Sequence, residues 1–348
     1  MIGFSPNANA RTPALFEPPP GKQLFIVGQD LGAIGGFAWP RNRGYVDGIP
    51  IAPAGVTTYL SLPRLAGMEK AANLGSGVLN AQAILANPRY AHAVLAIGLH
   101  FVGKEKAIAD GEMDAAIQRL ADWIRKSNRP VFLRIGYEFD GSWNHYDPEN
   151  YRKAFRRIVE ILRERGAKNC AMVWQSATSP VNGSRAPDVM KWYPGDDYVD
   201  WFGYSWFLNQ PRQIELTDAW LALAAERGKP VMVCESAPQG YDLKRLNKRS
   251  IFRGKNPQPK TAEQIWAEWY EPFFAYVNRN RHQIRAVAYI NANWNRQLMW
   301  GWPYSNGYWG DSRVQVNPVI REKWLAELSQ PGWMRATPSL FSELHSSR

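Results

Sequence analysis

Short apolar segments alternate with amphipathic segments along most of the chain, and this alternation is the feature that most restricts its fold. The apolar segments are rich in β-branched and aromatic residues, which is typical of buried strands. Most of them start about 29 to 39 residues after the previous one, close to the length of one βα unit. We expect strands at residues 24–29, 55–62, 92–101, 131–137, 170–175, 199–206, 231–234 and 286–291. The pattern predicts an α/β fold, a closed (β/α)8 TIM barrel with long loops on its C-terminal face.

Amphipathic segments between these strands predict the helices. The clearest start is at Asp147-Pro148, because aspartate caps free backbone amides and proline suits the first helical position. Helices are expected at residues 113–126, 148–165, 217–227, 262–278 and 318–328, and residues 31–53 are expected to form a long loop over the active face. The expected organisation is an extended N-terminal arm at 1–22, a single catalytic barrel at 23–332 and a C-terminal tail at 333–348.

Two of the predicted strands run directly into an isolated carboxylate. Residues 131–137 lead to Glu138, and residues 231–234 lead to Glu235. Residues just past the strand ends of a βα barrel converge on one mouth, so the two carboxyl groups are expected to face each other there. A single glutamate at a strand end is more often a solvated or salt-bridged residue. Two at the same mouth among aromatic rings favour acid-catalysed glycosidic cleavage.

The surroundings of the two glutamates predict different roles. Tyr137 and Trp143 lie close to Glu138 in the sequence, and desolvation by rings raises the pKa of a carboxyl group, which suits an acid. Arg134 lies on the same strand one barrel layer deeper, where it is expected to keep Glu235 ionised. The pair therefore predicts a retaining, double-displacement mechanism.

The strand that leads to Glu138 carries a recognisable pattern. Arg134, Glu138, Gly141 and Trp143 read Arg-x-x-x-Glu-x-x-Gly-x-Trp, which resembles the acid/base strand of glycoside hydrolase family 26, a family of clan A barrels. The resemblance implies a retaining glycosidase with Glu138 as acid/base and Glu235 as nucleophile. It also implies Tyr204 as a hydrogen-bond partner of the nucleophile.

Two positions depart from the family pattern. Tyr137 stands where family 26 usually has histidine, directly before the acid/base. Ser236-Ala237-Pro238 follows Glu235, where the family usually has an aromatic residue and then glycine. The first of these positions normally helps to recognise the sugar, so the resemblance leaves the substrate open.

Aromatic side chains are abundant, with 16 Trp, 15 Tyr and 14 Phe, and several lie in segments too polar for a core. Exposed rings commonly stack on sugar faces. A cluster of rings follows the strand at 286–291, and its first member, Trp294, is expected to form the platform beneath the sugar at the cleavage site. The expected substrate-binding residues are Asp30, Arg134, Tyr137, Trp143, Tyr204, Trp206, Trp294 and Trp300.

The net charge is +11, and the basic segment 243–260 contains seven Lys or Arg residues and no acid. This segment directly follows the strand of Glu235, so it leaves from the active-site face and predicts an anionic polysaccharide or oligosaccharide substrate. No nucleic-acid-binding signature accompanies the charge, so nucleic acid is not an expected partner. Two alternatives stay open: a catalytically silent carbohydrate-binding barrel, and a mannanase or glucanase acting on neutral glycans.

Several other site classes find no support in the sequence. Cys170 and Cys234 fall on next-but-one strands, roughly 9 to 10 Å apart, so both are expected to be free, buried thiols. The five histidines show no metal-ligand spacing, and no metal or cofactor is expected. No run of about 18 apolar residues predicts a membrane span. A monomer is expected, and the compartment stays open between secreted or periplasmic, if a leader was trimmed, and cytoplasmic.

Overall fold

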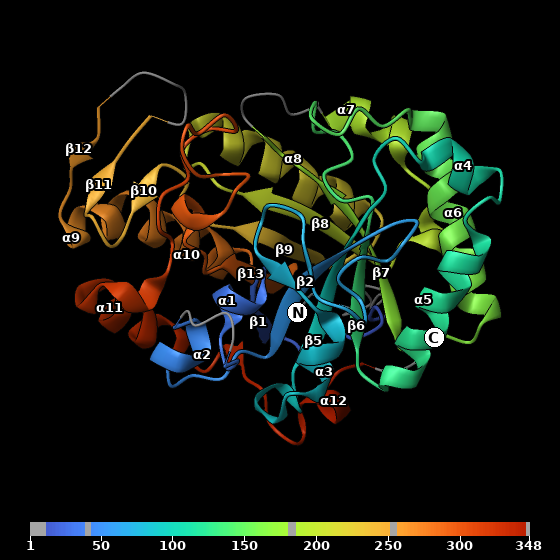
Figure 1. The fold of residues 1–348 in the computed structure, drawn as a ribbon, viewed down its shortest axis with the longest axis horizontal. Coiled ribbons are helices and arrows are strands. Elements are labelled where there is room, and N and C mark those ends of the chain that lie inside the picture. Colours follow the sequence, from blue (N-terminus) through green and yellow to red (C-terminus); the bar gives the residue numbers. More distant parts are fainter. Residues whose placement is uncertain (1–11, 39–42, 180–185, 251–255, 346–348) are drawn as a thin grey trace, which may run out of the picture.

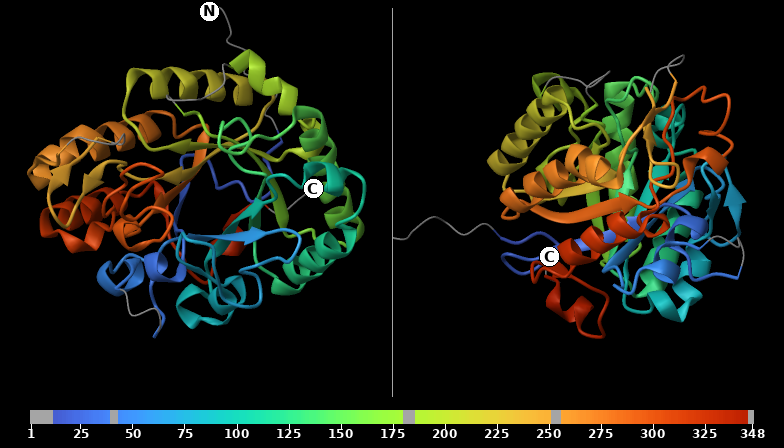
Figure 2. Two further views of the ribbon diagram at one scale, coloured as in Figure 1. Left: turned by 45° about the horizontal axis from the view of Figure 1, so that its top comes forward. Right: turned by 90° about the vertical axis from the view of Figure 1, so that its left-hand side faces the viewer.

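The computed structural model of the protein describes residues 12–38, 43–179, 186–250 and 256–345. Parallel strands form a closed barrel surrounded by helices (Figures 1 and 2). Neighbouring strands follow chain order, and β1 closes the ring by pairing with β13. The barrel strands are β1 (Gln23–Gly28), β2 (Gly55–Ser61), β5 (Val94–His100), β6 (Val131–Ile135), β7 (Cys170–Ser176), β8 (Trp201–Trp206), β9 (Val231–Ser236) and β13 (Ile284–Ile290). The predicted (β/α)8 TIM barrel is confirmed, with small differences at the strand ends.

Two of those differences concern the strands that carry the glutamates. β6 ends at Ile135, because Gly136 and Glu138 have φ values of 54° and 51°, in the left-handed region that breaks a strand. β9 continues to Ser236, so Glu235 belongs to the strand itself. The pairing of β8 with β9 shifts register just before Glu235. Such an irregularity re-aims side chains at the rim of a barrel.

Each of the predicted helices is present. α8 starts at Pro211 and not at residue 217, since proline suits the first helical position. The helix expected at 262–278 contains a π-helical turn, η4 (Trp266–Tyr270), between two α-helical parts. The larger helices are α5 (Asp114–Ser127), α6 (Pro148–Glu164), α8 (Pro211–Glu226), α9 (Ala262–Ile265), α10 (Glu271–Arg279) and α11 (Pro318–Leu328).

Shorter elements decorate the loops. Segment 31–53, expected to be a loop, contains two single-turn helices in its described part. Small antiparallel sheets form after β2 and after β9. These elements are α1 (Leu31–Ile34), α2 (Tyr45–Gly48), β3 (Ala72–Asn73), β4 (Val78–Leu79), α3 (Ala81–Ala86), η1 (Pro88–Tyr90), α4 (Glu105–Ala109), α7 (Ala186–Val189), η2 (Met190–Trp192), η3 (Asp196–Tyr198), β10 (Tyr241–Asp242), β11 (Asn247–Lys248), β12 (Gln258–Pro259), η5 (Trp294–Arg296), η6 (Val314–Val316), β14 (Trp333–Met334) and α12 (Leu340–Glu343).

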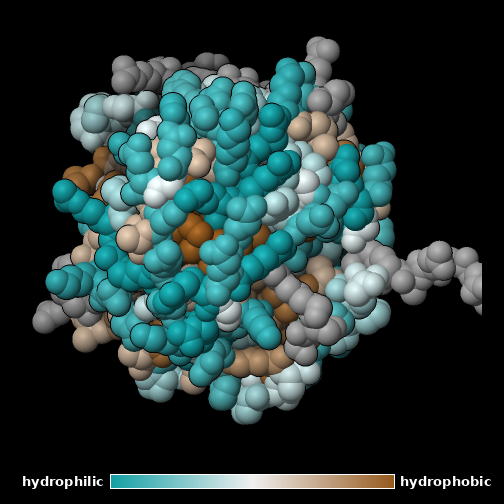
Figure 3. Space-filling model, turned by 90° about the vertical axis from the view of Figure 1, so that its right-hand side faces the viewer, coloured by the Kyte–Doolittle hydropathy of each residue, from teal (hydrophilic) through white to brown (hydrophobic). Residues whose placement is uncertain are grey.

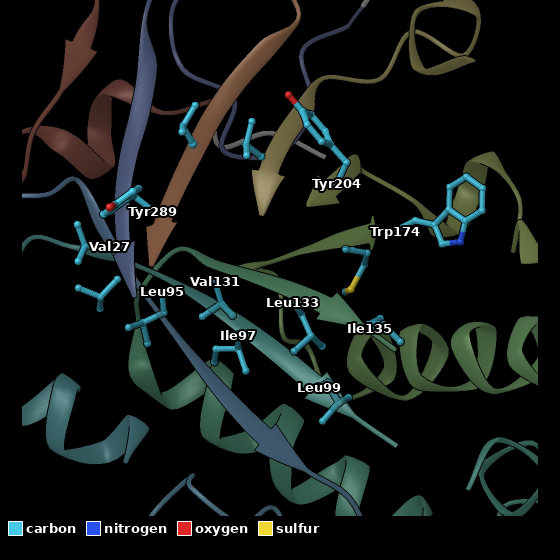
Figure 4. Close-up of a cluster of buried hydrophobic side chains, with 14 of the residues drawn as sticks. Val27, Leu95, Ile97, Leu99, Val131, Leu133, Ile135, Trp174, Tyr204 and Tyr289 are labelled. Atoms are coloured by element: carbon cyan, nitrogen blue, oxygen red, sulfur yellow. The ribbon is translucent and has the colours of Figure 1, made fainter. Parts of the chain in front are cut away.

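The core has two layers because successive strand residues face opposite sides of the sheet. Val131, Leu133 and Ile135 of β6 belong to the outer layer between sheet and helices, together with the side chains drawn in Figure 4. Phe132, between them in sequence, belongs to the inner layer inside the barrel. This alternation decides which side chains can reach the barrel mouth.

The described parts of the N-terminal arm and C-terminal tail cover the end of the barrel that lies away from the mouth. Leu15 and Phe16 from the N-terminal arm pack with Leu340 and Leu344 from the C-terminal tail against the inner-layer rings of the strands. The backbone NH of Phe16 donates to the carbonyl of His345 at 2.7 Å. β14, also from the tail, pairs with the start of β1. The described parts of arm and tail therefore share the core of the barrel.

The helical outer surface is largely hydrophilic on the side of α4, α5 and α6 (Figure 3). Ion pairs Arg157–Asp114 and Arg165–Asp122, both at 2.5 Å, link α6 to α5. Both pairs are partly exposed to solvent, so each contributes little to stability. Cys170 and Cys234 are buried thiols that form no disulfide, as expected. No helix in the described part of the chain is long and apolar enough to span a membrane.

Leu340 of the tail is 1% exposed, so shortening its side chain should cause a large loss of stability. Leu340→Ala should lower the free energy of unfolding by about 2–5 kcal/mol, since it leaves a cavity in a closed core. Leu298→Ala, at a side chain that is 88% exposed, is the matched control and should change it by less than about 0.5 kcal/mol. Urea unfolding followed by circular dichroism measures both. Equal midpoints for the two variants would show that the tail contributes nothing to the core.

Candidate active site

Glu138 follows β6 in a tight turn. A side chain at Gly136 would come within 2.6 Å of the ring of Phe101 and 2.7 Å of that of Tyr151, so only glycine fits there. Glu138 itself adopts a left-handed backbone conformation, which costs a non-glycine residue free energy. The turn aims the Glu138 side chain toward the ends of the neighbouring strands.

Buried hydrogen bonds hold this strained turn. The side-chain amide of Asn144 donates to the carbonyl oxygens of Tyr137 and Glu138, at 3.1 and 2.9 Å. The Asp140 carboxylate accepts from the Ser176 hydroxyl at 2.8 Å, at the end of β7. The same carboxylate also accepts from the backbone NH of Ala177, at 2.7 Å. The loop is therefore tied both to itself and to the adjacent strand.

The carboxyl group of Glu138 accepts two side-chain hydrogen bonds. The Ser205 hydroxyl donates to Oε1 at 2.7 Å, and the indole NH of Trp143 donates to Oε2 at 3.0 Å. Burial, and then the nearby Glu235 carboxylate, raise the pKa of Glu138 to about 8. Trp143 is 47% exposed and lies at the rim of the mouth. Glu138 thus lies between a buried hydroxyl and an exposed ring.

Glu235 forms a buried ion pair with Arg134. Nη1 of Arg134 donates to Oε1 of Glu235 at 2.7 Å, and the arginine side chain has no exposed surface. The same nitrogen donates to Gln175 Oε1 at 3.2 Å, and Nη2 donates to the Thr57 hydroxyl at 3.1 Å. The structure thus brings Arg134 and Glu235 together.

Two tyrosine rings flank the guanidinium of Arg134. Its central carbon lies 4.8 Å from the ring centroid of Tyr59 and 5.4 Å from that of Tyr137. The rings contact each other edge to face, with centroids 5.3 Å apart. Such cation–π contacts help to stabilise a desolvated cation. Tyr137, a predicted substrate-binding residue, therefore lies beside the glutamates.

The other expected residues of β8 lie outside the mouth. Trp201 belongs to the inner layer, so Gly203 and Ser205 also face inward, while Tyr204 and Trp206 face the helices. Tyr204 lies in the outer layer (Figure 4), and its buried hydroxyl has no hydrogen-bond partner among the described residues. The expected hydrogen bond from Tyr204 to Glu235 is absent.

Trp206 is also directed outward. It is 1% exposed, packs against Phe273 and Tyr276 of α10, and donates its indole NH to Asn209 at 2.7 Å. The prediction that Trp206 binds substrate is contradicted, because strand alternation places it behind the sheet.

The aromatic cluster after β13 is packed against itself. Trp294 is 2% exposed and donates to the Ser312 hydroxyl at 3.0 Å. Its ring lies 4.7 Å from that of Trp309 and 5.6 Å from that of Trp300. Trp294 therefore presents no open ring face in this structure, contrary to the expected platform. Trp300 is half-buried over it.

Asp30 acts as a helix cap in this structure. Its carboxylate accepts from the backbone NH groups of Gly32 and Ala33, at 2.8 and 3.3 Å, at the start of α1. Gln297 donates to its other oxygen at 3.2 Å. Burial outweighs these donors and raises the pKa of Asp30 to about 6. With 6% of its surface exposed, Asp30 offers little to a substrate hydroxyl.

Four polar residues that the sequence analysis missed lie around the glutamates: Thr57, Tyr59, Gln175 and Ser205. All come from inward positions near strand ends. The alternation of side chains along a strand could have identified them. Ser205 shares the inner face of β8 with Trp201, and Gln175 shares the inner face of β7 with Val173. Among the described residues, no group of three or more His, Cys, Asp or Glu side chains is arranged to hold a metal ion.

The basic segment 243–260 forms most of the sheet β10–β11–β12. Lys248 and Lys260 both pair with Glu268 of η4. Arg249 lies over the rings of Tyr304 and Tyr308, at 5.2 and 5.6 Å from their centroids. Arg253 and Lys255 lie outside the described residues. Part of this charge is thus already neutralised or stacked.

Comparison with known proteins identifies relatives along most of the chain. Residues 70–248 match Glycosyl hydrolase family 26. The β-1,3-xylanase TXYA of Vibrio sp. is 38% identical over 324 residues, which cover 92% of this chain and 68% of that protein. A β-1,3-xylanase of Alcaligenes sp. is 36% identical over 324 residues, covering 92% of this chain and 66% of that protein. The chain thus spans about two thirds of the length of each.

A solved structure matches at the level of fold. A modular endo-β-1,4-mannanase of Cellulomonas fimi aligns with a TM-score of 0.62 over 97% of this chain and 81% of that chain. The two sequences are 16% identical, so this similarity concerns the barrel alone.

The buried ion pair predicts a sharp effect on stability. Arg134→Met leaves the Glu235 carboxylate buried without its cation and should lower the free energy of unfolding by about 3–5 kcal/mol. Adding Glu235→Leu to Arg134→Met should recover much of that loss, because the uncompensated charge is gone. Urea unfolding of both single variants and the double variant measures this. Additive losses in the double variant would contradict a direct pairing.

Proposed function

The chain belongs to glycosyl hydrolase family 26, and we propose that this glycoside hydrolase is a retaining β-1,3-xylanase. The observation that carries the choice of substrate is the 38% identity to a β-1,3-xylanase, which extends over 92% of the chain. The retaining mechanism rests on the two carboxyl groups at the barrel mouth.

In this proposal Glu235 is the nucleophile and Glu138 is the acid/base. Glu235 attacks the anomeric carbon while Glu138 protonates the departing glycosidic oxygen, which leaves a covalent glycosyl-enzyme. Water then attacks the anomeric carbon, Glu138 takes the proton from the water, and the bond to Glu235 breaks. Two displacements retain the anomeric configuration.

The surroundings of each group support its role. Glu138 has a raised pKa because of burial and the neighbouring Glu235, so it holds a proton at neutral pH and can act as an acid. Glu235 accepts a charge-assisted hydrogen bond from the Arg134 guanidinium at 2.7 Å, which orients its carboxylate in the mouth as a nucleophile requires. A silent carbohydrate-binding barrel would have no use for two carboxyl groups in such different surroundings.

We propose a neutral xylan in preference to the anionic glycan expected from charge. Lys248 and Lys260 are paired with Glu268, so part of the basic segment does not offer free charge to a substrate. Two relatives that are 38% and 36% identical over 92% of the chain are also β-1,3-xylanases.

The roles of the glutamates predict distinct variant behaviour. Glu138→Gln and Glu235→Gln should each lower kcat by several orders of magnitude while the fold is kept, because both groups act in the transition state. With an activated aryl glycoside, added azide should give an α-glycosyl azide with Glu235→Gly and a β-glycosyl azide with Glu138→Ala. Proton NMR of the products distinguishes the two. Near-parental activity of either Gln variant would refute the assignment.

The substrate is tested with a polysaccharide panel at low and high salt. β-1,3-Xylan should be hydrolysed faster than β-1,4-xylan, β-1,3-glucan, β-1,4-mannan or an acidic glycan, and NMR should detect the β-anomer of the product first. Salt should have little effect, since the favoured substrate is neutral. If an acidic glycan were cleaved fastest and the rate fell at high salt, the substrate would be anionic. If mannan were cleaved fastest, the enzyme would be a mannanase.

A further inference from the structure

A continuous hydrogen-bond chain joins the two carboxyl groups at the barrel mouth through side chains of β7 and β8. Gln175 and Ser205 are its middle members, and both are buried. Neither belongs to the acid/base or nucleophile pair. The chain has a fixed direction, which follows from which of its groups can donate.

Arg134 sets the direction. A guanidinium has donors and no acceptor, so its contact of 3.2 Å with Gln175 identifies the facing amide atom as oxygen. The NH2 of Gln175 must then point the other way, toward the Ser205 hydroxyl oxygen at 3.1 Å. It also lies 3.5 Å from Oε1 of Glu235.

Ser205 is left with one orientation. A serine hydroxyl normally rotates among its partners, because it carries one proton and two lone pairs. Here the oxygen accepts from Gln175, so the proton is directed to Glu138 Oε1 at 2.7 Å. The carbonyl of Ser205 accepts from Thr178 Oγ1 at 2.7 Å and from Gln213 at 3.2 Å, which fixes the residue itself.

A fixed donor matters because Glu138 needs both protonation states in one catalytic cycle. It gives its proton to the departing oxygen in the first displacement and takes a proton from water in the second. A hydrogen bond to Oε1 favours the ionised form, which is the base required in the second displacement.

Other groups around Glu138 also affect its ionisation, some favouring the ionised form and some disfavouring it. Glu235 of β9 and Asp140 of its own loop disfavour the ionised form, and the indole NH of Trp143 favours it. Arg134 of β6, Tyr137 of the turn after β6 and Cys234 of β9 are further titratable groups nearby. Ser205 is uncharged, so its hydroxyl can be removed without changing the charge of the site.

We propose that Gln175 and Ser205 are positioning residues: Gln175, oriented by Arg134, holds the Ser205 hydroxyl as an obligatory donor to Glu138, and this donor readies Glu138 as the base of the second displacement. The proposal rests on the proposed retaining mechanism. It adds a role for two residues outside the pair of glutamates.

The test uses Ser205→Ala and the pH dependence of kcat/KM on β-1,3-xylan. Loss of the donor should raise the pKa of Glu138, so the alkaline limb of the profile should move up by about one pH unit, on the order of a charged hydrogen bond. Gln175→Leu should move the limb in the same direction by less, because the freed hydroxyl still points to Glu138 part of the time. Ser205→Thr keeps a hydroxyl and should restore much of the parental profile.

A second readout isolates the second displacement. With the 2,4-dinitrophenyl glycoside of β-1,3-xylobiose, the leaving group needs no protonation, so hydrolysis of the glycosyl-enzyme limits turnover. Ser205→Ala should show a burst of dinitrophenolate, followed by a steady state about tenfold slower and a lower KM, because the intermediate accumulates. Ser236→Ala removes a buried hydroxyl that donates to the Ala288 carbonyl at 2.9 Å, and it should leave the alkaline limb in place.

Each outcome separates this proposal from the proposed function. A parental alkaline limb and no change in the burst with Ser205→Ala would overturn the positioning role, while the Gln variants still test the glutamates. An equal loss in both displacements with an unmoved limb would show a structural role only, and would also overturn it. Circular dichroism and urea midpoints establish that each variant is folded.

Discussion

The buried ion pair between Arg134 and Glu235 is the constraint around which the barrel mouth is built. Removing a guanidinium from water costs several kcal/mol unless its charge and its donors are satisfied. Glu235, Gln175 and Thr57 accept from it, and the ring of Tyr59 covers one face. Polar side chains from several strands therefore accept hydrogen bonds from one buried cation.

Space for that cation comes from a missing side chain. A side chain at Gly98 of β5 would come within 2.9 Å of Arg134 Nη2 and 2.6 Å of the Tyr59 ring. The side chains inside the barrel thus change from apolar to polar along the barrel axis. Toward the chain ends it is filled by Phe132 and Trp201, and toward the mouth it gives way to the arginine and its partners. The large apolar contacts that stabilise the fold are thus separated along the barrel from the polar contacts around the two glutamates.

The two glutamates differ because their backbones differ. Glu235 lies within β9, just after the irregularity in its pairing with β8, and its carboxylate contacts Arg134 directly. Glu138 lies in a strained turn past its strand, where its carboxyl group accepts from a hydroxyl and an indole and, among the described residues, from no cation. Burial and the nearby Glu235 raise the pKa of Glu138, while a guanidinium contacts the Glu235 carboxylate, so the two groups have different surroundings.

The sequence alone determined the barrel and its strands, because these depend on local periodicity. It also placed Glu138 and Glu235 at strand ends that converge on one mouth, and their catalytic roles remain a proposal. It also indicated the contact between Arg134 and Glu235, because strand ends converge on one mouth. Alternation alone would turn Glu235 outward, since Met232 and Cys234 face inward, and the register shift between β8 and β9 changes that. Only the tertiary structure decided the fates of Tyr204, Trp206 and Trp294. Strand parity sends the first two behind the sheet, and loop packing buries the third. Strand alternation alone would have placed Ser205 and Gln175 on the inner face, but the hydrogen bond between them joins residues 30 positions apart in the sequence, and only the tertiary structure shows it.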